Sequence, residues 1–427
     1  MLIKNFLLSL SLLVCVGSLQ ASNDYTKAPT SNQEIVGAQF DTISQTGHGL
    51  LEVVNHYNNL ESPDQLRFLS KISGEQYTTL FTSAEMVNRQ FIRHLYDPLR
   101  PLISNPCSYL DEVYDMCSYD GIEIWGSGSV NRGFLSGNRN AEGFKMSGYD
   151  VSVGAQKRLT STWLLGGAFC YSMQHTSYNI GGSSKDQGAI GALYTLYRPS
   201  SYYFLTNLTF GVTEVEMHRR FKISRPNPKY VPPGERKAPP ATKKDGEKAA
   251  EVKEEPKEIE HNFMSHAKPK ISQVSFYSEI GKDFIWDCFL IQPFVGIEAE
   301  QYRRKCVIEK NAAPLNLVIS KKDLTSAFSR VGFHLSALDY AYDVNFAFDL
   351  AWQYRLTSPK TDLGVQFVYF GEPFKITGIP VERNSIDVCF NASTGLMDGW
   401  LVYIQAAGQK WSRVSNYNFT LGLMAQW

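Results

Sequence analysis

The sequence predicts an all-β membrane protein: a twelve-stranded antiparallel transmembrane β-barrel, preceded by a short helical segment expected to plug the lumen. Three observations support this prediction. Apolar and polar residues alternate in twelve separate stretches, the connections between those stretches alternate in length, and the chain opens on an apolar segment typical of an export signal. Strands with lipid on one side and a polar lumen on the other produce such alternation.

Residues 1–21 are expected to be a signal peptide. A lysine near the start precedes the apolar stretch Phe6–Val16, and Ala21 offers a small residue for cleavage. The stretch is too short to cross a bilayer as a helix. A lipoprotein would instead use Cys15, but Val14 before it is not the small residue that lipoprotein processing favours. We therefore expect the chain to be exported. Together with the predicted barrel, this indicates the outer membrane of a Gram-negative-type bacterium.

The charge balance argues against a nucleic-acid partner, and the hydropathy excludes helical membrane spans. Lys plus Arg number 42 and Asp plus Glu number 42, so no basic field indicates nucleic acid as a partner. No apolar run of about 18 residues or more follows the signal, which excludes helical membrane spans. A barrel passes this test, because only alternate residues of each strand touch lipid.

Residues 22–120 carry helical patterns. Ser62, Pro63 and Gln65 resemble a helix start, with Ser at the cap, Pro at the first position and Gln three residues on. Apolar residues then recur at helical spacing until two prolines, at positions 98 and 101, end the pattern: Leu80, Ala84, Val87, Phe91 and Leu95. The segment is either an amphipathic helical hairpin packed on another surface or a helix inside the barrel.

Residues 121–427 carry the strand pattern, which is clearest from Val344 to Leu356. Seven large apolar residues occupy one face there, while the other face carries small and polar residues that include Asp349 and Arg355. A soluble edge strand does not need so continuous an apolar face. A lipid-facing strand with an aromatic girdle does.

The same alternation recurs in eleven further stretches, and the even total returns both ends of the barrel to one side. These stretches are Ile122–Asn131, Tyr149–Gln156, Trp163–Ser172, Ile190–Leu196, Phe204–Val212, Val274–Ile280, Ile291–Ala299, Arg330–Leu335, Ile386–Ala392, Trp400–Gln409 and Tyr417–Trp427.

The connections support the barrel because short and long ones alternate, as periplasmic turns and outer loops do. The short ones are Arg158–Trp163, Arg198–Tyr202, Asp283–Phe289, Ser336–Asp343 and Gly395–Trp400. The long ones are at about 132–143, 175–186, 218–271, 303–324, 357–384 and 410–416. A soluble β-sandwich is the alternative, but its core faces would have to meet each other.

The longest connection has its own composition. Residues 222–270 are rich in Pro, Lys and Glu, with almost no large apolar residue between Glu235 and Glu258. Such a segment cannot bury enough apolar surface to offset its ordering entropy. We expect a disordered, charged extracellular loop.

Six pieces of the chain together carry a family resemblance. They are Leu69–Tyr77 before the barrel, the Phe- and Arg-containing segment Phe91–Arg100, the aromatic opening Ile124–Gly126, the strand piece Gln292–Gly296, the loop piece Phe374–Pro380, and the last strand ending in Trp427. In this order they resemble the β-domain of bacterial autotransporters, the translocators of type V secretion, in which the loop piece follows the ninth strand. The match covers roughly Asp64 to Trp427.

The resemblance implies that the last strand is an assembly signal, captured by the barrel-assembly machinery through strand addition. The residues of this signal alternate towards the C-terminal aromatic: Phe419, Leu421, Leu423, Ala425 and Trp427. In the alternative interpretation this strand merely closes the barrel. The other expected partner is outer-membrane lipid, and we expect a monomer.

The chain departs from the family in its passenger. Typical members carry several hundred passenger residues, whereas here only residues 22–120 separate the signal from the barrel, so the passenger is very short or absent. The residues give no basis for carrying over the family's self-cleavage. That reaction needs an Asn of the plugging helix facing acidic barrel residues, and Asn88 is the candidate by position alone.

Charged residues on the inward faces are expected to line the lumen and to pair with a plug helix bearing Arg89 and Arg93, rather than to form a catalytic carboxylate group. They are Glu123, Asp150, Glu298, Glu300, Arg330, Asp349, Arg355 and Asp387.

We expect no enzyme, cofactor or metal site. A phospholipase or protease would need a Ser/His/Asn or Asp/His set, whereas His334 faces inward and His175 and His218 have no nucleophile pattern nearby. His261 and His266 would lie in the disordered loop without a rigid frame. Cys107 and Cys117 could form a disulfide in an oxidising periplasm, and the sequence leaves this open, as it does for Cys288 and Cys306.

The sequence therefore predicts an autotransporter-type outer-membrane barrel that anchors or translocates a short N-terminal segment and displays surface loops. A passive pore and an adhesin using loop 222–270 remain the alternatives.

Overall fold

The computed structural model describes residues 30–44, 51–96, 98–99, 121–226, 258–286, 289–337, 344–358, 360–397 and 399–426. The expected signal peptide, Cys107, Cys117, Cys288 and Trp427 lie outside these residues. The helical elements come first: α2 (Ser31–Ser44), α3 (Leu51–Asn59), α4 (Ser62–Ser73), the 3₁₀ helix η1 (Glu75–Thr79) and α5 (Leu80–Tyr96). None of these helices is long and apolar enough to cross a membrane.

Twelve strands of the described chain form one closed antiparallel barrel, in which β18 pairs with β1 and β9 with β12. This confirms the predicted fold and all twelve predicted strands. The strands are β1 (Ile122–Leu135), β2 (Phe144–Thr160), β3 (Trp163–Tyr178), β4 (Ser183–Tyr197), β5 (Tyr202–Pro226), β7 (Lys270–Lys282), β9 (Phe289–Arg304), β12 (Lys322–Ala337), β13 (Val344–Arg355), β16 (Asn384–Met397), β17 (Trp400–Lys410) and β18 (Val414–Gln426). The short β8 (Phe284–Trp286) folds back on β9.

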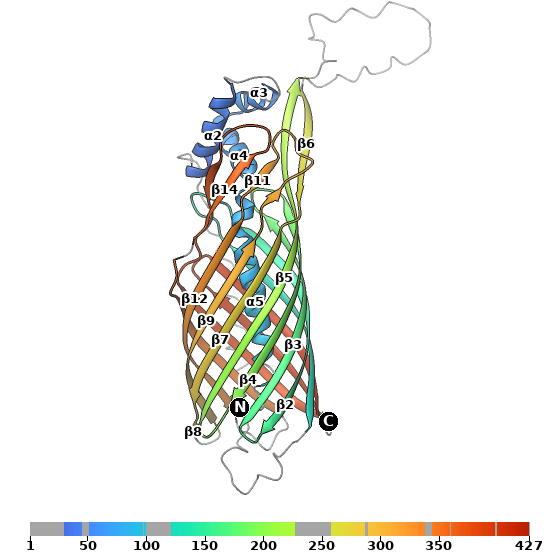
Figure 1. The fold of residues 1–427 in the computed structure, drawn as a ribbon, viewed down its shortest axis with the longest axis vertical. Helices are drawn as coiled ribbons and strands as arrows, with labels where there is room; N and C mark the ends of the chain where they lie inside the picture. Colours follow the sequence, from blue (N-terminus) through green and yellow to red (C-terminus); the bar gives the residue numbers. More distant parts are fainter. Residues whose placement is uncertain are drawn as a thin grey trace, which may run out of the picture.

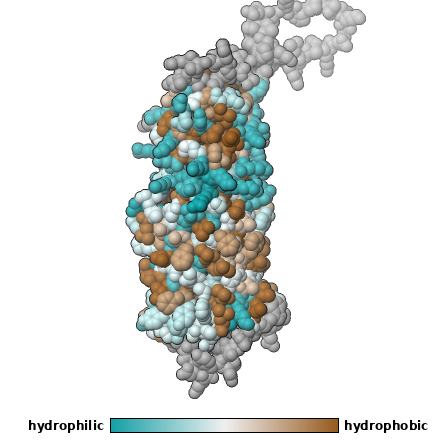
Figure 2. Space-filling model, viewed as in Figure 1, coloured by the Kyte–Doolittle hydropathy of each residue, from teal (hydrophilic) through white to brown (hydrophobic). Residues whose placement is uncertain are grey.

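Burial alternates along the barrel strands as the sequence pattern predicts. In β13, Asp349, Ala351 and Arg355 are buried, whereas Phe346 and Trp352 point outward and are about half exposed. Figure 2 shows apolar residues across the lower half of one face and a hydrophilic zone above them. A lipid-facing belt explains why so many large apolar side chains are exposed.

Two expected long connections are wrong. β3 ends at Tyr178 and β4 begins at Ser183, so a tight turn replaces the loop expected at 175–186. In the same way, β17 ends at Lys410 and β18 begins at Val414, so a tight turn replaces the loop expected at 410–416. Beyond the apolar belt both faces of a strand can be polar. The backbone ladder therefore continues where the alternation that reveals strands has ended.

The expectation of disorder over 222–270 is wrong at both ends. β6 (Glu258–Ala267) pairs with β5 as far as Pro226 and forms a hairpin that rises above the barrel, where Phe221 and Phe263 stack with ring centroids 5.4 Å apart (Figure 1). Backbone pairing with a strand anchored in the barrel overrides the charged composition. The residues between the two strands, 227–257, lie outside the described chain.

A four-stranded sheet that the sequence did not predict lies at the same end of the barrel as this hairpin (Figure 1). Its strands come from two of the other predicted long connections, 303–324 and 357–384: β10 (Val307–Ile308), β11 (Leu317–Ile319), β14 (Asp362–Phe367) and β15 (Phe374–Thr377). Helices α2 and α4, η1 and this sheet bury one apolar core, which includes Ile72, Leu317 and Ile376. We call α2–α4, η1 and the four-stranded sheet the cap.

The start of α4 differs from the predicted capping box by one residue. The N-cap is Glu61 and makes no side-chain capping bond, while the Gln65 amide reaches back to the Tyr57 carbonyl at 3.1 Å. The α4 helix ends at Ser73, and the left-handed φ of 79° at its C-cap Gly74 allows the chain to turn into η1. The sequence pattern predicted α4 but not the turn at Gly74 and η1, after which α5 enters the barrel.

Candidate functional site

Helix α5 descends inside the barrel from the cap (Figure 1). Of the two interpretations of this segment, the helix inside the barrel is therefore confirmed, and the hairpin packed on another surface is wrong. Its predicted apolar residues are all buried but pack in two layers. Leu80 and Ala84 join the core under the cap, whereas Val87, Phe91 and Leu95 join a second core in the lumen with Tyr194 and Tyr277 as wall residues. The polar faces of the same helix meet the charged lining.

One polar face of α5 carries Glu85 and Arg89, one helical turn apart. Arg89 Nη2 lies 2.8 Å from Glu85 Oε1, and Arg355 of β13 donates to the same carboxylate at 2.6 and 2.9 Å. Both guanidinium groups also pack against the Phe328 ring, at 4.2 and 4.6 Å from its centroid. A buried carboxylate thus joins a helix cation to a wall cation.

Arg93, one turn further along α5, meets the wall at Asp387. Its Nη2 lies 3.4 Å from one carboxylate oxygen, while Arg330 donates to the other at 3.1 Å. Arg89 in turn lies 3.9 Å from both Glu298 and Glu300 of β9. Charges of both signs thus lie between α5 and the wall, which limits the cost of burying them.

Asn88 projects towards the wall formed by β5, β7 and β9. Its amide nitrogen donates to Ser275 at 3.1 Å and to Glu300 at 3.2 Å, and its oxygen accepts from Thr209 and Gln273, both at 3.1 Å. The structure therefore places this residue beside an acidic wall side chain, with both ends of its amide held by hydrogen bonds.

The opposite face of α5 contacts β1, β2 and β18. Gln90 donates to Asp150 at 2.5 Å, and His94 lies 3.1 Å from the same carboxylate and 3.2 Å from Thr420 of β18. Because β18 and β1 are the two ends of the barrel sheet, these contacts place the plug against the closing seam.

The eight predicted lumen charges lie on the inner side of the wall, and α5 touches five of them: Asp150, Glu298, Glu300, Arg355 and Asp387. The other three pair within the wall. Arg330 binds Asp387, Asp349 lies 2.7 Å from His334, and Glu123 accepts from Gln156 at 2.5 Å. The sequence interpretation missed the helix carboxylate Glu85, because its partner Arg355 is 270 residues away.

Above the plug, a fully buried ion pair joins the cap to the hairpin. Arg219 of β5 donates to both carboxylate oxygens of Glu309, at 3.0 and 2.5 Å. Tyr77 of η1 and Ser265 of β6 donate to that carboxylate as well, each at 3.0 Å. Neither charge could be identified beforehand, since outer connections carry no periodicity.

A second polar contact holds α2 on the four-stranded sheet of the cap. The Asn32 side chain exchanges two hydrogen bonds with the Thr377 backbone, at 3.0 and 2.8 Å, and donates to the Asn140 carbonyl at 3.1 Å. The side chain of Asn140 also donates to Thr377 at 2.8 Å. Residues from α2, the β1–β2 connection and β15 therefore meet at one point.

The described assembly residues of β18 are exposed on the outside of the barrel, except for the small Ala425. Phe419, Leu421 and Leu423 are exposed to between 38% and 54%, whereas Ala425 is 4% exposed between Ile124 and Trp400 of the flanking strands. The register places β18 against β1 along their whole length.

Comparison with known proteins identifies the family. The family model of the autotransporter β-domain matches residues 124–229 and 262–407, more than half of the chain. Among solved structures, the translocator domain of the autotransporter NalP from Neisseria meningitidis is 12% identical with a TM-score of 0.53, covering 74% of this chain and 93% of that one.

The β-domain of the Bordetella autotransporter BrkA is 15% identical with a TM-score of 0.43, covering 72% of this chain and 100% of that one. No curated protein matches this chain. The closed twelve-stranded barrel, the helix in its lumen and the family match agree, and the chain belongs to the autotransporter β-domain family of outer-membrane barrels.

Proposed function

We propose that this barrel is a closed outer-membrane anchor that holds its own helical N-terminal segment at the cell surface. The observation that carries the proposal is α5, whose charged residues Glu85, Arg89 and Arg93 are paired with the wall while its apolar residues fill the space between. The chain then runs from the cap through the lumen to β1, so the cap is tethered by the plug.

A passive pore is the first alternative, and the lumen supports it less well. An open channel would keep its lining charges hydrated, whereas Glu298, Glu300 and Asp150 are each at most 4% exposed and lie against α5. Opening a path for solutes would require breaking several of these contacts together.

A surface adhesin is the second alternative. The β5–β6 hairpin supports it, and the adhesin would still use the same barrel as its anchor. β5 and β6 extend beyond the barrel and are joined through Arg219 to the cap, which makes a supported platform for display. In both versions the outward face of the barrel contacts lipid, and we propose that β18 is presented to the assembly machinery by a monomeric chain. We propose no catalytic role.

Ion conductance tests the closed anchor. Purified barrel in a planar bilayer is expected to pass little current, whereas deletion of residues 62–104 should open an ohmic pore. The milder Arg89→Ala/Arg93→Ala variant should give intermittent openings, because it removes the helix cations while leaving the wall intact.

Two controls make the result interpretable. Heat-modifiable migration shows that each variant is folded, and the intact mass of the wild-type chain shows that α5 is still covalently joined to β1. A wide steady channel in the intact wild type would contradict the closed anchor. A mass that reveals a break within α5 would contradict the tether.

A further inference from the structure

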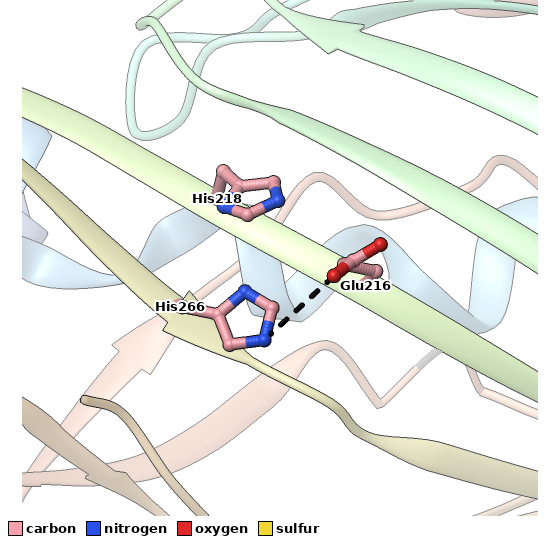
Figure 3. A group of neighbouring side chains, drawn as sticks. All are labelled: Glu216, His218 and His266. Atoms are coloured by element: carbon pink, nitrogen blue, oxygen red, sulfur yellow. Dashed lines mark ion pairs between the residues drawn. The ribbon is translucent and has the colours of Figure 1, made fainter. Parts of the chain in front are cut away.

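Two histidines face each other across the hairpin that rises above the barrel. His218 of β5 and His266 of β6 are direct cross-strand partners with ring centroids 4.9 Å apart, and Glu216 lies two residues before His218 on the same face of β5. Figure 3 shows the three side chains gathered together, with the His266 Nε2 to Glu216 Oε1 contact at 3.8 Å. One ligand atom from each lies within 4.8 Å of the others.

The backbone beneath this cluster is held from both sides. The amide and carbonyl of His266 exchange hydrogen bonds with Lys310, both at 2.9 Å, while β6 pairs with β5 on its other side. β5 is in turn paired with β4, where Lys185 lies opposite Glu216. The expectation that His266 lacks a rigid frame is therefore wrong, and only side-chain rotation is needed to bring the three groups closer.

His218 is suited to be a ligand in its neutral form. Burial lowers the pKa of His218, and the neighbouring His266 lowers it further, which favours the uncharged imidazole near neutral pH. Nδ1 of His218 is also shielded from solvent and has no hydrogen-bond partner. A polar nitrogen in that position gains from any group that can accept its lone pair.

We propose that Glu216, His218 and His266 bind one Zn²⁺ ion, or a similar borderline divalent transition-metal ion, with a fourth position open to water. Two imidazoles and one carboxylate are donors that Zn²⁺ accepts readily, whereas Mg²⁺ and Ca²⁺ prefer all-oxygen sets. With bonds of about 2.0–2.2 Å, tetrahedral ligand atoms lie roughly 3.4 Å apart. The present spacing therefore closes through rotation of partly exposed side chains.

The surroundings set the strength of the site. Lys268 Nζ lies 3.5 Å from Glu216 Oε1, and both side chains are well exposed, at 56% and 41%, so this ion pair is easily given up. Lys268 and Arg220 nevertheless place positive charge beside His218 and oppose a cation. Affinity is accordingly moderate, and removal of Lys268 strengthens it.

A bound ion would cross-link β6 to β5 near the base of the hairpin. The strand pair is otherwise held by backbone hydrogen bonds and by contacts such as the Phe221–Phe263 stack. The cluster also lies past the apolar belt, which on this strand ends near Val212, so the ion is exchanged with the external medium. Metal supply would then decide how firmly the hairpin is fixed.

Calorimetric titration of the detergent-purified full chain with ZnCl₂ tests the proposal. One equivalent should bind, His218→Ala and His266→Ala should each weaken binding at least about tenfold, and Lys268→Gln should tighten it severalfold. His261→Ala is the matched control, because His261 lies on β6 outside the cluster and is exposed, and it should bind as the wild type does.

A second readout keeps the result independent of folding defects. Co²⁺ bound to wild-type protein should give the intense visible absorption of a four-coordinate site, which Glu216→Gln should weaken while heat-modifiable migration stays normal. The proposal is overturned if no zinc binds up to millimolar concentration. It is equally overturned if the two histidine variants bind zinc as well as the His261→Ala control does.

Discussion

Glu75, at the joint between α4 and η1, is a buried carboxyl with only partial compensation. Its Oε1 accepts one backbone hydrogen bond, from Glu142 at 3.0 Å, while Oε2 is buried with no hydrogen-bond partner. Burial raises the pKa of Glu75 to about 8. The folded cap therefore prefers the protonated acid, whereas the unfolded segment ionises near pH 4.5.

This difference predicts that the cap loosens as pH rises. Between about pH 4.5 and 8 the folded state holds a proton that the unfolded state has lost, so the free energy of unfolding falls with pH and levels off above 8. Glu75→Gln should remove this slope. It should lower the equilibrium fraction of molecules with an open cap at pH 8 by about tenfold or more, since a shift of one pKa unit changes that equilibrium by a factor of ten.

Hydrogen exchange of α4 and η1 amides, corrected for intrinsic rates and compared at pH 6 and pH 8, measures this effect. Asp64→Asn is the matched control, because that carboxyl lies exposed on α4 in the same cap. Equal pH slopes in the wild type and in Glu75→Gln would show that the carboxyl does not govern cap opening.

At the same scale, the sequence could predict the orientation of wall charges but not their partners. Alternation fixes which side of a strand a residue faces, and so it placed Asp387 and Arg355 on the inner side. The pairing of Arg355 with Glu85 depends on how far α5 descends and how it rotates. That depth is set by Gly74 and η1, and nothing in the local periodicity of α5 encodes it.

Several inward-facing glycines let aromatic side chains of the adjacent strand lie flat against the wall. Gly422 of β18 is the tightest of them, because a Cβ there would lie 2.0 Å from the ring of Tyr403 on β17. Tyr403 is 1% exposed. Packing of this kind couples neighbouring strands through side chains, in addition to the backbone ladder.

Gly422→Ala is therefore expected to reduce the folded fraction, with an overpacking cost of about 1–3 kcal/mol. In a Tyr403→Ala background, which carries its own loss of packing, the further change Gly422→Ala should cost little, because the ring that the added methyl would meet is gone. Heat-modifiable migration after refolding at graded urea concentrations measures the folded fraction.

Gly128→Ala is the matched control. It lies on β1, which pairs with β18, and a Cβ there meets nothing within 4 Å. A Gly128→Ala defect as large as that of Gly422→Ala would contradict the packing explanation. So would a Gly422→Ala defect that is equally large with and without the Tyr403 ring.

Elements in the apolar belt could be predicted, and elements above it could not. Lipid on one side and the lumen on the other impose alternation on β13, so its pattern is visible in the sequence. In β6 and in the small sheet β10–β11–β14–β15, water and the cap replace lipid, and either face of a strand can be polar. Those strands form because barrel strands and the Arg219–Glu309 pair hold their neighbours in place.

The molecule as a whole has two unlike ends. Tight connections such as Arg198–Tyr202 lie at the lower end, where the C-terminal end of the chain also lies, and the cap and hairpin lie at the upper end (Figure 1). In the proposed orientation the short turns face the periplasm, and the cap then lies outside the cell. Because α5 runs from the cap towards the end with the short turns, the orientation of the barrel decides where the N-terminal segment is displayed.

Trypsin added to intact cells tests this orientation. Cleavage is expected within residues 227–257, which contain Arg236 and Lys243 among other sites. The two fragments should stay together in a folded barrel until heated, since β5 and β6 on either side are hydrogen-bonded to each other and to the wall. Cleavage that appears only after the outer membrane is permeabilised would mean that the cap and hairpin face the periplasm, and the anchor would then display nothing at the surface.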